Sequence, residues 1–170
     1  MKIKSDFITN SSSSSFIVAW PRRVKKPGDV SKFISNPSFV KVIFKDIMNK
    51  KGFFNGKRTK ALLKTMVDEL SSGYVDNMHS FSVFEKEFCE RENITREDLS
   101  KNSTWRKIFF DEERMVIDRE AVVLAKKFLE RNRGAYVYIF EYGDEGGGIY
   151  EELEHHNNWG GLPHIRISKH

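Results

Sequence analysis

The sequence predicts an α+β fold that is mostly helical, with a small sheet built from strands near both chain ends. Two apolar segments rich in β-branched and aromatic residues, 15–20 and 135–142, are typical of strands. Between them, apolar residues recur at helical spacing and are separated by capping residues. A length of 170 residues suits one domain, 1–170, with one substantial core. Helices grouped between terminal strands favour an α+β arrangement.

The first strand is expected over residues 15–20, and it ends at Pro21 because proline cannot donate to a sheet ladder. Residues 1–14 are interpreted as a serine-rich lead-in to this strand. A basic loop follows over 22–28, and Asp29 is expected to cap a short helical turn.

Three helices are predicted next. Asn36 as N-cap and Pro37 at the first position begin a helix that ends near Gly52. A second helix covers about 59–71, and a third begins at a capping box formed by Ser82 and Glu85.

The second half of the chain predicts more helix and two strands. Thr95 and Asp98 open a short helix, and residues 104–132 form one or two helices, with Asp118 as a plausible cap for the second. Residues 135–142 give the strongest strand signal, and 164–168 alternate as in an edge strand. We expect residues 16–19 to lie beside 136–141 as buried neighbours, because sheets need partner strands.

Charge is distributed unevenly along the chain. Residues 1–70 hold 15 Lys and Arg against 5 Asp and Glu, or +10, whereas residues 71–170 hold 14 against 19, or −5. The basic half suits contact with nucleic acid or an acidic protein, or with the acidic half of the same chain. No apolar run approaches the roughly 20 residues that span a bilayer, so no membrane association is predicted. With the single Cys89 and no secretory signal, a cytoplasmic location is expected.

The opening contains a short motif: a basic start, then Asp-Phe-Ile-Thr-Asn at 6–10, serines at 11–15 and Phe16. This motif resembles the opening of a group of uncharacterised bacterial and phage proteins, some of which also end with a Pro-His-x-Arg stretch like that at 163–166. The resemblance covers the two chain ends and implies an origin in a phage or mobile element, without implying a reaction. The serine run itself is interpreted as a modification, cleavage or recognition site, or as a plain lead into the first strand.

One candidate binding site is the segment between the first two long helices. Cations can neutralise phosphates there, and aromatic rings can stack on bases. The alternative is that the rings anchor the turn in the core. The candidate residues for binding a nucleic acid or another partner are Lys50, Lys51, Phe53, Phe54, Lys57, Arg58 and Lys60.

A second candidate is the acidic and histidine-rich segment near the C-terminus. Glu151 and His155 are four residues apart and share a helical face, and His164 on the following strand completes a three-ligand set for a divalent metal. The alternative is a solvated surface turn, since no established metal-binding spacing is present.

These observations favour a small accessory protein of a phage or mobile element that binds a host protein or nucleic acid without catalysis or a cofactor. The alternative is a metal-dependent hydrolase or nuclease that uses the C-terminal Glu/His cluster with a divalent metal. The sequence leaves the oligomeric state open.

Overall fold

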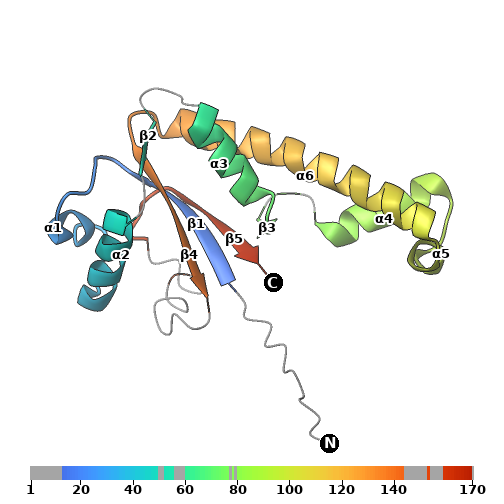
Figure 1. Cartoon of the computed structure of the whole chain (residues 1–170), viewed down its shortest axis with the longest axis horizontal. Coiled ribbons are helices and arrows are strands. Elements are labelled where there is room, and N and C mark those ends of the chain that lie inside the picture. Colours follow the sequence, from blue (N-terminus) through green and yellow to red (C-terminus); the bar gives the residue numbers. More distant parts are fainter. Residues whose placement is uncertain are drawn as a thin grey trace, which may run out of the picture.

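The computed structural model describes residues 13–49, 52–55, 60–76, 78, 80–143, 153 and 159–169, and it confirms the α+β class. Its five strands form one antiparallel sheet in the order β2-β4-β1-β5-β3 (Figure 1). The strands are β1 (Ser13–Trp20), β2 (Phe53–Phe54), β3 (Tyr74–Val75), β4 (Tyr136–Gly143) and β5 (His164–Lys169). The helices are α1 (Pro27–Val30), α2 (Pro37–Asn49), α3 (Lys60–Leu70), α4 (Phe81–Glu92), α5 (Arg96–Lys101) and α6 (Ser103–Arg131).

The central strand β1 lies between β4 and β5, and its pairing with β4 is the one that the sequence predicts. Phe16 lies opposite Phe140 and Ala19 opposite Val137, and all four side chains are buried. The strand begins at Ser13 rather than at residue 15, because Gly143 and Lys169 provide ladder partners for Ser13 on its two sides. Ser13 and Ser14, which were assigned to the serine-rich lead-in, therefore belong to the strand.

The sheet carries helices on both faces (Figure 1). Along β1, alternate side chains such as Phe16 and Trp20 pack with α1 and α2, whereas Ile17 and Ala19 pack with α3 and the C-terminal part of α6. This alternation follows from the two-residue period of a strand. The result is two hydrophobic clusters, one on each face.

Strand β5 was expected at an edge, and this expectation is wrong. It pairs with β1 on one side and with β3 on the other, where Tyr74 lies opposite Ser168 and Val75 opposite Ile167. A two-residue strand such as β3 carries too little sequence pattern to be predicted.

Two of the predicted helix caps form as the sequence indicates. The Asn36 side chain accepts a hydrogen bond from the Ser38 N–H at 2.9 Å, and Thr95 and Asp98 form the expected capping box of α5. The capping box at Ser82 is wrong, because α4 begins two residues earlier, with Ser80 as its N-cap. Asp29 lies inside α1, where its carboxylate accepts hydrogen bonds from the backbone of the two residues before the helix.

Helix α6 is continuous, and Asp118 lies within it rather than at a cap. With 29 residues it is about 43 Å long. Its N-terminal half buries Phe109 against α4 and α5, whereas its C-terminal half buries Ala125 against α3 and the sheet. Sixteen residues separate these two positions, so the two buried faces point about 160° apart around the helix. The change of face removes the single apolar stripe that identifies a long helix in sequence.

The N-terminal half of α6, together with α4 and α5, projects away from the sheet as a helical arm (Figure 1). Within the described part of the chain, no helix combines the length and the apolar character needed to cross a membrane.

Candidate functional site

One end of the sheet gathers two segments that are far apart in the sequence. Strand β1 leaves the sheet at Trp20, which lies opposite Tyr136, and the short strand β2 pairs with the same end of β4. The basic loop after β1 and the segment around β2 therefore flank the same corner of the sheet.

Phe54 is the exposed aromatic residue of this corner. Its side chain is 47% exposed, and its ring centre lies 5.0 Å from that of Tyr136, with the planes tilted by 39°. The alternative of a core anchor is therefore incorrect for Phe54. Lys60, the first residue of α3, is also exposed. For Phe53 the structure describes only the backbone, and the other four candidates, Lys50, Lys51, Lys57 and Arg58, lie outside the described residues.

Asn55 fixes β2 in place. It is 4% exposed, and its side-chain amide donates to the carbonyl oxygens of Leu129 and Asn132, both at 2.7 Å. Its backbone N–H donates to the Ala135 carbonyl at 2.8 Å. These contacts reach the end of α6, more than 70 residues away in the sequence, so sequence analysis had no local signal for them.

Gly52 lets the backbone just before β2 lie close to the Tyr138 ring of β4. A Cβ atom at this position would lie 2.4 Å from the Tyr138 ring, well inside van der Waals contact. The glycine before Phe53 therefore lets the backbone pass directly over β4. Together, the close approach at Gly52 and the buried hydrogen bonds of Asn55 place Phe54 against β4.

The basic loop reaches the same aromatic residue of β4. Burial raises the pKa of the Tyr138 hydroxyl, while a hydrogen bond with the Val24 backbone and the nearby charge of Arg23 act in the opposite direction. Val24 itself is buried and anchors the loop. The loop and the β2 segment thus meet at Tyr138.

Four cations of this loop face solvent: Arg22, Arg23, Lys25 and Lys26. In the described residues, no ion pair joins any of these four side chains to a carboxylate. Asp29 is the nearest acidic group in the sequence, and its carboxylate accepts hydrogen bonds from the Lys25 and Lys26 backbones, which lower its pKa. The four cationic groups are exposed, and no carboxylate of the described residues neutralises them through an ion pair. An exposed ring at the same corner as exposed cations can stack on a base while the cations contact phosphates.

The C-terminal metal hypothesis can be examined at only one of its three residues. His164 is half-buried at the start of β5, and its Nδ1 donates to the Leu162 carbonyl at 2.8 Å, which leaves Nε2 as the available ligand atom. Glu151 and His155 lie outside the described residues. In the part of the chain that the structure describes, no three His, Cys, Asp or Glu residues form a group suited to a metal ion.

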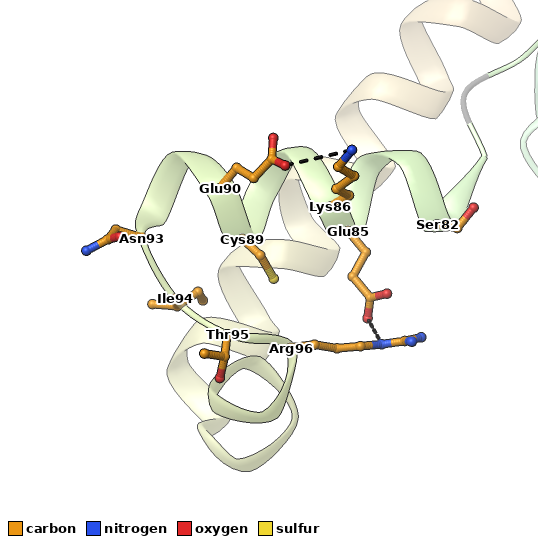
Figure 2. A pocket seen from close by; sticks show the side chains of 9 residues that line it. All are labelled: Ser82, Glu85, Lys86, Cys89, Glu90, Asn93, Ile94, Thr95 and Arg96. Atoms are coloured by element: carbon orange, nitrogen blue, oxygen red, sulfur yellow. Dashed lines mark hydrogen bonds and ion pairs between the residues drawn. The ribbon is translucent and has the colours of Figure 1, made fainter.

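A depression of about 590 Å³ lies between α4 and α5 and contains Cys89 (Figure 2). Ion pairs border it, with Arg96 Nε 3.0 Å from a Glu85 oxygen and Lys86 Nζ 3.9 Å from a Glu90 oxygen. Burial, and then the charge of Glu85, raise the pKa of the Cys89 thiol. The thiol therefore stays protonated at neutral pH, which argues against a nucleophilic role.

No protein-family model, curated protein or solved structure matches this chain. Its class is therefore defined by its own architecture, an α+β protein with a central antiparallel sheet and a helical arm. The functional argument depends on the groups that the surface presents.

Proposed function

We propose that the protein is a small accessory protein of phage or mobile-element origin that acts by binding a host nucleic acid rather than by catalysis. The observation that carries this proposal is the exposed Phe54 ring at the same end of the sheet as a loop of four exposed cations, none of which has an ion pair among the described residues.

The expected ligand is single-stranded. An unpaired base offers its flat face to an aromatic ring, whereas bases inside a duplex are covered by their neighbours. Phe54 rests against Tyr136 and presents its remaining surface to solvent. Arg22 and Lys25 would then contact the phosphates on either side of the stacked base.

A host protein with an acidic surface is the competing partner of the same corner. Exposed cations could bind either an acidic protein or a nucleic acid. An exposed aromatic ring at the same corner favours a ligand with aromatic bases. A pull-down from host lysate, with and without nuclease treatment, separates the two when it is repeated with the Arg22→Glu, Lys25→Glu variant. Capture of a protein that persists after nuclease treatment and is lost in this variant would contradict the proposal.

The decisive measurement is fluorescence anisotropy with a short labelled oligo(dT) and the matching duplex. The Phe54→Ala variant is compared with Phe81→Ala, whose ring is equally exposed at 47% but lies on α4. Loss of one stacked base is worth about 1–3 kcal/mol, so Phe54→Ala should weaken single-strand binding roughly fivefold or more. Phe81→Ala should leave the affinity unchanged. Equal effects of the two variants would refute the assignment of this site.

A second comparison tests the cations. The double variant Arg22→Glu with Lys25→Glu should lower the slope of log affinity against log salt by about 1.4, since each lost phosphate contact contributes about 0.7 for a single strand. The control reverses two exposed charges of the helical arm, Arg106→Glu with Lys107→Glu. A slope that changes equally in both double variants would show nonspecific attraction instead of a site.

A further inference from the structure

A groove of about 770 Å³ lies between the end of α3 and the middle of α6, and the proposed nucleic-acid site does not use it. It exists because α3 ends at Leu70 while α6 continues toward the helical arm. Phe110, Ile117 and Ala121 lie on one side of α6, since steps of seven and four residues return to nearly the same direction. Ala121 is completely buried in the cluster that includes α3, whereas Phe110, beyond the end of α3, is 48% exposed.

The helix face that packs against α3 therefore extends past its partner. Phe110, Ile117 and Val122 of α6 line the groove, together with Val67 of α3. A helix laid in the groove would continue the packing of α3 against α6 on the same face.

The polar rim of the groove is mainly acidic. Asp68, Glu113 and Asp118 contribute three carboxylates, and Arg114 contributes one cation. The carbonyl end of α3 adds partial negative charge. The rim is therefore complementary to a cationic partner.

Glu113 places a partly buried carboxylate in the groove. Its side chain is partly buried, and no hydrogen bond or ion pair joins it to another residue in the described part of the chain. Burial raises the pKa of its carboxyl group, which reflects the cost of keeping this charge away from water. A cation placed in the groove would offset that cost.

We propose that this groove binds a basic amphipathic helix of a partner protein. The apolar face of the helix would cover Phe110 and Ile117, and Lys or Arg residues on its flanks would pair with Glu113 and Asp118. Recognition of a helix in an apolar groove is a recurrent mode of protein association, and the charged rim sets its specificity. The protein would then bind a nucleic acid at one corner of the sheet and a protein helix along α6, and the two sites depend on different residues.

The probes are two synthetic helical peptides of identical length, one built from Leu and Lys and the other from Leu and Glu. Binding is followed by anisotropy of the labelled peptide at physiological salt. The Leu/Lys peptide should bind the intact protein, and the Leu/Glu peptide should not. Equal binding of both peptides, or no binding of either, would overturn the proposal.

Variants then locate the contact. Phe110→Ser should weaken binding of the Leu/Lys peptide by about tenfold, the effect of losing about 1.4 kcal/mol of contact. The matched control is Val123→Ser, whose side chain is 50% exposed on another side of α6 and should leave binding unchanged. Glu113→Gln should weaken binding at low salt and have less effect at high salt, because screening already reduces the ion pair. Equal losses in Phe110→Ser and Val123→Ser would contradict the assignment.

Two further measurements test where the peptide binds and whether a second copy of the chain occupies the groove. Hydrogen exchange with bound peptide should slow over 67–72 and 110–122 in the intact protein, and protection located elsewhere would refute the site. Sedimentation of the free protein tests a second copy as the occupant. A dimer that Phe110→Ser dissociates would assign the groove to self-association and overturn the proposal.

Discussion

Asn55→Ala is expected to destabilise the fold substantially, although it removes only one small polar side chain. The amide of Asn55 donates two hydrogen bonds of 2.7 Å, to the carbonyls of Leu129 and Asn132. The Leu129 contact is buried, so its carbonyl would lose its partner without access to water, at a cost of about 1–3 kcal/mol. The Asn132 contact is partly buried and is worth about 0.5–1.5 kcal/mol.

Loss of the Asn55 Oδ1 atom has the opposite sign, since this buried oxygen has no hydrogen-bond partner among the described residues. The balance is a loss of about 2 kcal/mol in the free energy of unfolding. Urea unfolding followed by circular dichroism measures it.

The control for this measurement is Asn102→Ala. Asn102 caps α6 through an exposed side chain that accepts hydrogen bonds from Thr104 and Trp105, and its loss should cost about 1 kcal/mol. A cost for Asn55→Ala no larger than that of Asn102→Ala would refute the role assigned to the buried amide. Asn55→Asp tests the donor requirement directly, because a carboxylate would face two carbonyl oxygens. It should destabilise more than alanine at neutral pH and recover part of the loss in acid.

Two further predictions concern the pKa of Asp98 and metal binding near the C-terminus. Hydrogen bonds from Thr95, its hydroxyl first, hold the pKa of Asp98 below its ordinary value, so this group stabilises α5 above about pH 4 and loses that effect as the pH falls through its folded-state pKa. In NMR titrations, Thr95→Val should raise the pKa of Asp98, and an unchanged value would contradict the capping argument. Calorimetry with zinc, manganese and magnesium tests the metal hypothesis, in which combined alanine substitution of Glu151, His155 and His164 abolishes binding. Binding that is absent from the intact protein, or that survives the triple substitution, would exclude it.

The sequence alone predicted features whose interactions are local. The segment 135–142 became β4, and Asn36 caps α2 as expected, because both depend on residue type and short-range spacing. The pairing of β1 with β4 also followed, since these are the two longest apolar strand segments and need one another as partners.

The incorrect expectations arose where a distant contact outweighs the local pattern. Asp118 resembles a helix cap, yet α6 continues through it because each half of the helix packs against a different partner. Ser82 resembles a helix N-cap, but Ser80, two residues earlier, is the N-cap of α4, and its side chain accepts a hydrogen bond from the Val83 N–H. The position of β5 inside the sheet depends on β3, a strand of two residues.

What the sequence by itself determined was the fold class, the main strands and helices, and the basic character of the segments that reach the candidate interface. Only the tertiary structure decided that Phe54 is exposed while Asn55 beside it is buried, because the partner of Asn55 is the end of a helix more than 70 residues away. The groove along α6 is likewise a tertiary property. Whether an apolar residue such as Phe110 is covered depends on where the neighbouring helix α3 ends in space, and no local pattern in the α6 sequence contains that information.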